Sequence, residues 1–214
     1  MRRIAISSIL LFLLLATVSA ARAQSAAQRW ELGPRFRLLT AGGRPANDMF
    51  GPGAYGRYRL NERWLVGFAV DSITGDYERP YEIAGLSSPE EIDSTVDALV
   101  LSGWVEREYG RTNGKLRWFW SAGFGFSSPD TDDITGPVSG GGTFDITTDA
   151  GSEILVSVGG GLRRGLGRRW SFEVGVQVDQ HFTEWTVTDR VSGRTGTLDN
   201  YTTRGLLGGL TYRF

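Results

Sequence analysis

Apolar and polar residues alternate along most of this 214-residue chain. Successive side chains of a strand point to opposite faces, so a period of two indicates strands with two different surfaces. The clearest case ends the chain, where Leu206, Gly208, Leu210, Tyr212 and Phe214 share one parity. No helical period competes with this pattern after the first 23 residues, so the sequence predicts an all-β fold.

Eight stretches of the chain show this alternation, and the connections between them differ in length. The connections 61–63, 110–115 and 165–169 are short, and the second contains the hairpin-turn pair Asn113-Gly114. The connections 41–52, 72–94, 128–151 and 188–200 are long. This predicts an antiparallel up-and-down sheet with short turns at one end, long loops at the other, and both termini at the short-turn end. The predicted strands are residues 30–40, 53–60, 64–71, 95–109, 116–127, 152–164, 170–187 and 201–214.

Aromatic residues gather on the apolar parity at the short-turn end of these strands. Outgoing strands carry tryptophans near their starts, and three returning strands carry aromatic residues near their ends. Amphipathic rings of this kind collect at membrane–water interfaces. A water-soluble core would not place tryptophans repeatedly at the same end of alternate strands. We therefore predict an aromatic belt at one membrane interface, made of Trp30, Tyr58, Trp64, Tyr109, Trp118, Trp170, Tyr212 and Phe214.

The opposite parity carries charges of both signs. A charge facing lipid at the bilayer centre would cost about 2–4 kcal/mol, whereas the inside of a barrel can hold charges in pairs. An eight-stranded barrel is only wide enough for its own side chains. The sequence therefore predicts a lumen filled by arginine–carboxylate pairs and no wide aqueous pore. The predicted inward charges are Glu31, Arg35, Arg37, Arg57, Arg59, Asp71, Glu106, Glu108, Arg117, Arg163, Glu173 and Asp179.

The fourth stretch fits this parity least well. Its alternation sends Trp104 inward and places Leu99, Leu101 and Val105 outward. An extra residue in one strand would shift the alternation, so we consider a β-bulge there.

The first 23 residues have the order of a secretory signal peptide. Arg2 and Arg3 precede the apolar run 4–18, and Ala21-Arg22-Ala23 is a small-x-small cleavage site. A membrane-spanning helix would need about 20 apolar residues. We predict a cleaved signal peptide at 1–23 and one barrel domain at 24–214. The chain contains no cysteine, so it forms no disulfide, and the signal is not of the lipoprotein type.

The end of the chain resembles the closing strand of bacterial outer-membrane β-barrels, which carries a glycine and two aromatic residues at the positions of Gly209, Tyr212 and Phe214. Leu207 departs from the polar residue that this pattern prefers before the glycine. The resemblance implies recognition by the barrel-assembly machinery. Residues 30–214 as a whole resemble the eight-stranded outer-membrane proteins, including the barrel domain of outer membrane protein A and the small barrels X and W. This implies an eight-stranded transmembrane β-barrel in the bacterial outer membrane, in contact with lipid and lipopolysaccharide.

Three functions are open at this point. The first is a non-enzymatic outer-membrane protein with a charge-plugged lumen and a structural role, or a role in binding a surface partner through the long loops. The second is an importer of small apolar molecules with a lateral exit, which a cavity lined by Leu65, Trp104, Phe119 and Leu155 would favour. The third is a soluble, periplasmic, lipocalin-like barrel.

The sequence offers little that points to catalysis or to cofactor binding. Some small outer-membrane barrels are enzymes that use a histidine, a serine and an acid. Here His181 points inward with no serine beside it, and Ser171 only shares its strand parity, so we expect no catalytic residue. We expect no cofactor and no metal, and the net charge of -1 argues against nucleic acid as a partner. The carboxylates of the long loops are of the type that binds calcium or magnesium, also together with lipopolysaccharide phosphates, and this alternative stays open. We interpret them as solvated side chains: Asp76, Glu78, Glu82, Glu90, Glu91, Asp93, Asp130, Asp132, Asp133, Asp145 and Asp149.

Overall fold

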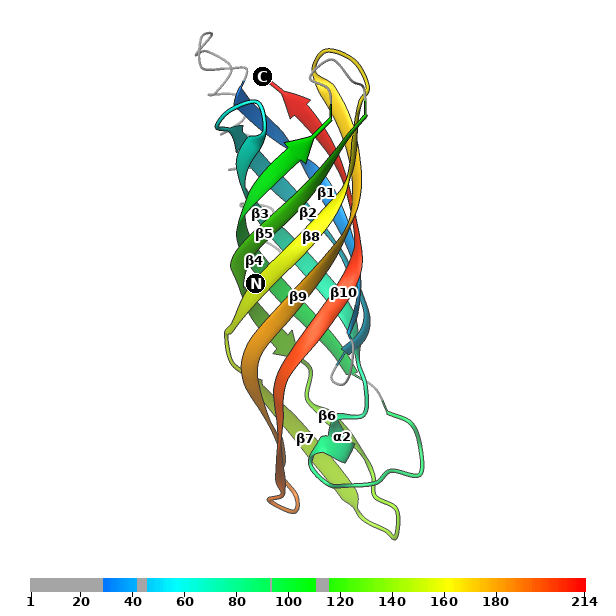
Figure 1. Ribbon diagram of the computed structural model, residues 1–214. Coiled ribbons are helices and arrows are strands. Elements are labelled where there is room, and N and C mark those ends of the chain that lie inside the picture. Colours follow the sequence, from blue (N-terminus) through cyan, green and yellow to red (C-terminus); the bar gives the residue numbers. More distant parts are fainter. Residues whose placement is uncertain (1–28, 42–45, 93, 111–115) are drawn as a thin grey trace.

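Eight long antiparallel strands close into a barrel in the computed structural model (Figure 1). The structure describes residues 29–41, 46–92, 94–110 and 116–214. The predicted signal peptide, the pair Asn113-Gly114 and Asp93 lie outside these residues. The strands of the barrel are β1 (Trp30–Ala41), β2 (Ala46–Arg59), β3 (Trp64–Tyr77), β4 (Ser94–Tyr109), β5 (Leu116–Thr131), β8 (Glu153–Gly165), β9 (Trp170–Asp189) and β10 (Thr195–Arg213).

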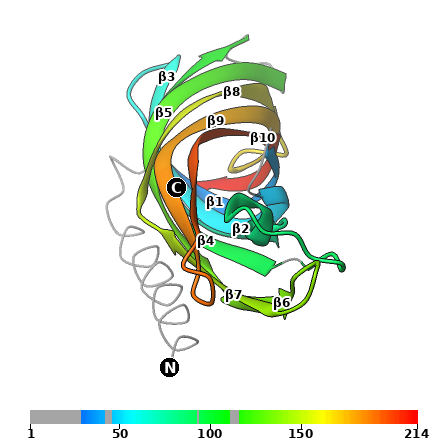
Figure 2. The same ribbon diagram turned by 90° about the horizontal axis from the view of Figure 1, so that it is seen from below.

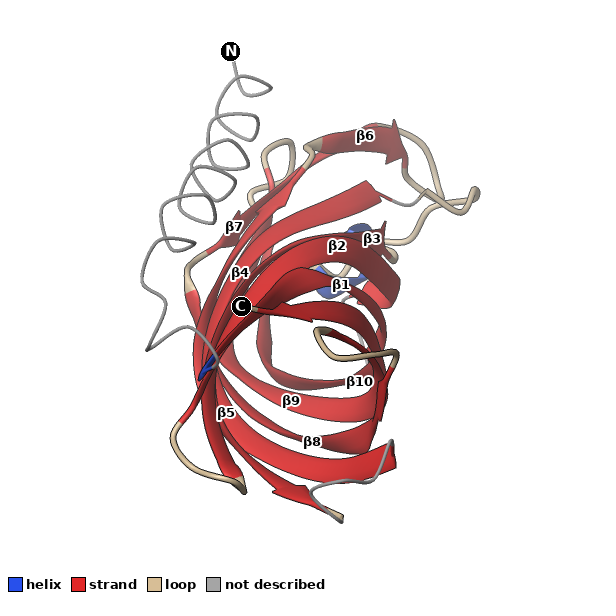
Figure 3. Cartoon of the chain, turned by 90° about the horizontal axis from the view of Figure 1, so that it is seen from above, coloured by secondary structure: helices blue, strands red, loops and turns tan. Residues whose placement is uncertain are grey.

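The sheet closes because its last strand pairs with its first. Each barrel strand pairs with its neighbour in the chain, and β10 pairs with β1 from Glu31↔Arg213 to Ala41↔Thr203. Seen from the C-terminal end, the strands form a ring (Figure 3). Full closure leaves no unpaired edge along this ring, which is the condition for a sheet to cross hydrocarbon. The predicted eight-stranded up-and-down barrel is confirmed.

The outer surface of the ring is apolar over most of the strand length. Along β9 the residues from Trp170 to Val178 alternate between exposed apolar side chains and buried or half-buried positions, which are polar except for Gly175. Phe124 on β5 and Val176 on β9 are 63% and 60% exposed. A water-soluble protein buries such side chains, and a continuous apolar band of this size indicates contact with lipid. Within the described part of the chain, no helix is both long enough and apolar enough to span a bilayer.

The strands extend further at the long-loop end than the alternation predicts. β2 begins at Ala46, β3 continues to Tyr77 and β5 to Thr131. The predicted loop 128–151 contains the hairpin β6 (Ile134–Pro137) and β7 (Thr143–Ala150), and β7 pairs with β9. These segments were predicted as loops because their outward side chains are polar and their inward side chains apolar, which reverses the pattern of the membrane-spanning part.

Beyond the long-loop end of the barrel, residues of the connecting segments form a small hydrophobic core of their own. The short helix α2 (Pro80–Ile83) packs with β7, β9 and β10, and Tyr81 stacks on Phe144 with ring centroids 5.4 Å apart. Figure 1 shows α2, β6 and β7 together at this end, and Figure 2 views the barrel from the same end. We call this unit the loop lobe. Its buried side chains are Tyr81, Ala84, Leu86, Ile134, Phe144, Ile146 and Val187.

The bulge considered for the fourth strand is absent from the described pairing of β4. The register between β3 and β4 runs from Trp64↔Arg107 to Tyr77↔Ser94 without a shift. Trp104 points inward, as its parity predicts, because glycines in the adjacent strands leave room for the indole. A Cβ added to Gly67 would lie 2.4 Å from Trp104 Cε2, and one added to Gly123 would lie 2.7 Å from Trp104 Cβ.

Candidate functional site

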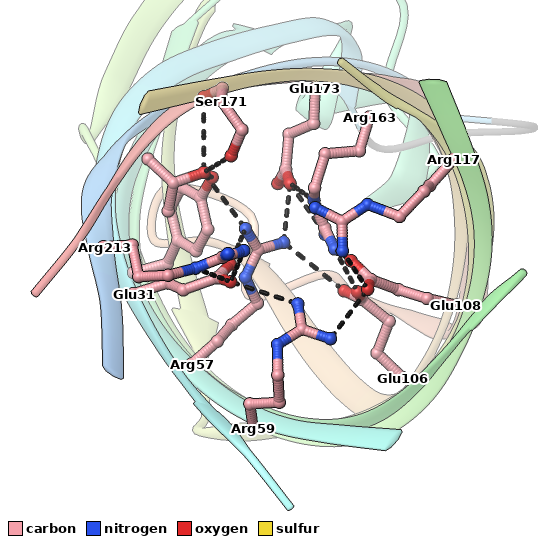
Figure 4. A network of polar contacts seen from close by, with 12 residues as sticks. Glu31, Arg57, Arg59, Glu106, Glu108, Arg117, Arg163, Ser171, Glu173 and Arg213 are labelled. Atoms are coloured by element: carbon pink, nitrogen blue, oxygen red, sulfur yellow. Dashed lines mark hydrogen bonds and ion pairs between the residues drawn. The ribbon is translucent and has the colours of Figure 1, made fainter. Parts of the chain in front are cut away.

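The barrel interior at the short-turn end is filled by a network of arginines and glutamates (Figure 4). Arg57 lies at its centre and is almost fully buried. Its Nη1 donates to Glu173 Oε2 at 2.6 Å and its Nη2 to Glu31 Oε2 at 3.0 Å, while Glu106 Oε2 lies 3.5 Å from Nη1. One guanidinium therefore joins carboxylates from three different strands.

Arg163 forms the second centre of this network. It donates from Nη1 to Glu106 Oε1 at 2.7 Å and from Nε to Glu173 Oε2 at 2.9 Å, and it also contacts Glu108. Charge-assisted contacts of this kind satisfy carboxylates that have lost their water. The short-turn network consists of Glu31, Arg57, Arg59, Glu106, Glu108, Arg117, Arg163, Glu173 and Arg213, which come from seven strands.

A central network follows further along the barrel axis. Arg35 donates from Nε to Asp71 Oδ1 at 2.6 Å, and Arg37 contacts both Asp71 and Asp179. The Arg35 guanidinium also lies over the Trp104 ring, with its carbon 5.4 Å from the ring centroid. The structure thus brings the twelve predicted inward charges together in two groups. Eight join the short-turn network, and Arg35, Arg37, Asp71 and Asp179 form the central network.

A third polar group, the histidine cluster, lies nearer the long loops. Glu153 is fully buried and accepts hydrogen bonds from Trp185 Nε1 at 2.8 Å and from the Tyr201 hydroxyl at 3.0 Å. His181 Nδ1 lies 2.8 Å from Glu153 Oε2, its Nε2 lies 3.3 Å from Thr203 Oγ1, and its ring stacks on Tyr201. These five residues define the cluster.

The order acid, imidazole, hydroxyl in this cluster is that of a hydrolase triad. Its surroundings argue for a structural role, because Thr203 is fully buried and His181 is only 5% exposed. Ser171 bonds to Thr211 in the short-turn half and is not a partner of His181. A substrate would have no access to the Thr203 hydroxyl in this arrangement.

Sequence reasoning missed several interior residues that parity alone could have found. Arg213 has inward parity at the end of β10, and its Nη2 donates to Glu31 Oε1 at 2.7 Å. Glu153 shares its parity with Leu155 and Arg163 on β8. The partners of Glu153 follow from the register of three strands, which the sequence does not specify.

The eight predicted belt residues lie at the short-turn end, on the outside of the barrel. They pair across strands, with ring centroids 5.1 Å apart for Trp30 and Tyr58 and 4.0 Å for Tyr109 and Trp118. Trp170, Tyr212 and Phe214 form a further chain of edge contacts. Trp64 packs edge-on against Trp120, which the predicted belt did not include. We use the name aromatic belt for the eight predicted residues together with Trp120.

The cavity that would favour an apolar ligand is small, and both polar and apolar side chains line it. Trp104 and Phe119 line a cavity of about 30 Å³ together with Arg35, Glu106 and Gln177. Such a volume holds about one or two water molecules. Leu155 lies instead in an apolar cluster beneath the loop lobe, and Leu65 is buried elsewhere. The described residues contain no group of three or more acidic, histidine or cysteine side chains placed to hold a metal ion.

The chain has no detectable relative by sequence, but its structure is similar to that of known proteins. No protein-family model matches the chain, and no curated protein matches its sequence. The structure is similar to that of OprG, an outer membrane protein of Pseudomonas aeruginosa, with a TM-score of 0.64, 9% identity, and coverage of 88% of this chain and 97% of OprG. It is also similar to the Neisserial surface protein A, with a TM-score of 0.56, 12% identity, and coverage of 86% and 97%.

The chain has the fold of the small bacterial outer-membrane β-barrels. Together with the apolar outer surface, this places the protein in the outer membrane and is incompatible with a soluble, lipocalin-like container. Short turns of such barrels face the periplasm and long loops face the outside. On this general pattern we expect the aromatic belt at the periplasmic interface and the loop lobe outside the cell.

Proposed function

We propose that this protein is a non-enzymatic integral outer-membrane barrel with a charge-plugged lumen, and that its role is structural or lies in binding a surface partner. The observation that carries the proposal is the short-turn network. Arg57 and Arg163 extend across the interior from β2 and β8 and share Glu106 and Glu173. Contacts with carboxylates from several strands support the interpretation of these side chains as a plug.

The energetics of the network favour a closed lumen. Removing one partner from a buried ion pair lowers the stability by about 3–5 kcal/mol, because the remaining charge stays buried without a partner and without water. A hydrated ion passing through the barrel would have to separate several such pairs. The central network lies in series with the first, so both would have to open.

The loop lobe supports a role at the cell surface. Its small core fixes the long loops against one another, so they present a shaped surface instead of independent chains. In this proposal the partners are outer-membrane lipid, lipopolysaccharide and a surface partner bound by the lobe. Gly209, Tyr212 and Phe214 at the end of β10 would serve the barrel-assembly machinery during biogenesis.

Planar-bilayer recording tests the plug. Refolded protein, checked by the heat-dependent shift of its gel band, should produce no stable conductance of porin size. Large and stable current steps from the same preparation would contradict the proposal. A porin inserted in the same bilayer serves as the positive control.

Import of a small apolar molecule is the second candidate, favoured by the apolar cluster beneath the loop lobe. This cluster includes Leu39, Ile73, Val100 and Leu155, and a molecule entering from outside would meet it first. Lateral exit would then avoid both ion-pair networks. Uptake of such a molecule into proteoliposomes that falls on Trp104→Asp substitution would support import, and equal uptake by both forms would argue against it.

A further inference from the structure

Arg107 is a basic residue on the lipid-facing side of the barrel. It lies on β4 between Val105 and Tyr109, whose side chains also point outward. Its register partners are Trp64 on β3 and Trp120 on β5. The guanidinium therefore lies within the aromatic belt and not in the lumen.

Aromatic rings hold this side chain in place. The Arg107 guanidinium carbon lies 5.3 Å from the Trp64 ring centroid and 4.9 Å from that of Tyr109. Tyr109 is itself fixed, because Trp120 Nε1 donates to its hydroxyl at 3.1 Å and Trp118 stacks on its ring. A cation over ring faces is stabilised by their negative charge density, but this contact leaves the outer guanidinium nitrogens available.

Arg107 differs from the interior arginines in having no carboxylate beside it. It forms no ion pair with any residue that the structure describes, and its buried Nε has no hydrogen-bond partner. A cation on the lipid-facing surface is costly unless it reaches the headgroup level. The belt marks that level, where phospholipid phosphates lie.

We propose that Arg107 and the rings around it bind the phosphate of an anionic phospholipid in the periplasmic leaflet. The planar guanidinium matches phosphate oxygens in a two-pronged contact. The rings would pack against the glycerol and upper acyl carbons of the same lipid, which a free phosphate ion lacks. This commits the site to a lipid headgroup.

The distribution of exposed charge supports an anionic ligand at this end. The described residues at the periplasmic end, in the turns and at the end of β8, expose Arg63, Arg164, Arg168 and Arg169, which outnumber the exposed acid Glu62. The exposed side chains at the opposite end of the apolar band include Arg204 but also the acids Asp48, Asp76, Asp97 and Asp130. The barrel thus offers mostly basic side chains to the periplasmic leaflet and mostly acids to the outer one.

Native mass spectrometry of the refolded protein tests this site. The probe is phosphatidylglycerol, titrated against phosphatidylcholine in mixed detergent micelles. The wild type should retain one phosphatidylglycerol at about fivefold lower lipid concentration than Arg107→Gln, which corresponds to the usual gain for one basic residue at an anionic surface. Arg107→Lys keeps the charge but not the two-pronged contact, and it should lie between the two.

The matched control is Arg204→Gln, which removes another exposed arginine, in the middle of β10 and opposite Thr40 near the extracellular end of β1. It should retain phosphatidylglycerol like the wild type. An equal loss in both glutamine variants, or no loss in Arg107→Gln, would overturn the proposal. Displacement of the lipid by inorganic phosphate at matched concentration would also overturn it, because the site would then be a simple anion site. If Arg107→Gln does not fold, the Arg107→Lys series and the phosphate competition still decide.

Discussion

At the scale of the residue, the face to which a side chain points follows from its odd or even position along the strand, which the sequence gives directly. The twelve charges predicted to point inward do lie inside the barrel, and Trp104 follows its parity despite its size. What the sequence does not specify is which inward residues meet. The contact of Glu153 with Trp185 and Tyr201 depends on the register of β8, β9 and β10, and a shift of one residue would break it.

The short-turn network makes a direct prediction about stability. Replacing Arg163 with glutamine should lower the free energy of unfolding by about 3–5 kcal/mol, because Glu106, Glu108 and Glu173 would stay buried with one cation fewer. Urea unfolding of the barrel in lipid vesicles measures this. Arg190→Gln is the control, since its pair with Asp133 is half-exposed and should contribute at most about 1 kcal/mol. Equally small changes in both variants would mean that the network does not stabilise the barrel.

At the scale of the element, the membrane-spanning parts of the strands were predictable and their extracellular continuations were not. Inside the bilayer an apolar outer face and a polar inner face give a clear period of two. Beyond it the outward positions turn polar, as at Ser72 and Asp97, while inward positions such as Ile73 and Val96 become apolar. The contrast between the faces reverses there, and the hairpin β6–β7 was missed for this reason.

The turn that joins β9 and β10 is held by Asp189. Its carboxylate accepts hydrogen bonds from the backbone N–H groups of Asp145 at 2.9 Å, Val191 at 3.2 Å and Ser192 at 2.9 Å, and from the Ser192 hydroxyl. Burial raises the pKa of Asp189, but these hydrogen bonds outweigh it and lower the pKa from 3.8 to about 2. The carboxylate therefore stabilises the turn fully above pH 3.8, and this contribution is lost as the pH falls through about 2.

Nuclear magnetic resonance of the micelle-bound protein can follow this titration. The amide signals of Asp145 and Ser192 should shift together with a midpoint near pH 2, and Asp189→Asn should abolish the shared titration. A midpoint near 4, the ordinary value for an aspartate, would show that the hydrogen bonds do not favour the charged form.

At the scale of the whole molecule, closure and membrane residence were predictable because lipid leaves a sheet few alternatives. Backbone groups in hydrocarbon must all be paired, and only helices and closed barrels achieve this. The apolar runs of the predicted strands are too short for a spanning helix, which leaves the barrel. The specific role could not be predicted in the same way, since one fold serves many functions. The loop lobe and the aromatic rings around Arg107 depend on packing between segments that are distant in the sequence, which parity does not determine.

The central claim is that the apolar face of the strands meets hydrocarbon. The chain has no cysteine, so a single cysteine introduced by substitution can carry an environment-sensitive dye. Val176 on β9 and Val191 at the tip of the β9–β10 turn are 60% and 61% exposed, and only the first lies on the predicted lipid face. In refolded proteoliposomes the dye at Val176→Cys should be quenched by nitroxide-labelled lipid and protected from aqueous iodide, and the dye at Val191→Cys should behave in the opposite way. Equal quenching of both positions by iodide would contradict the account.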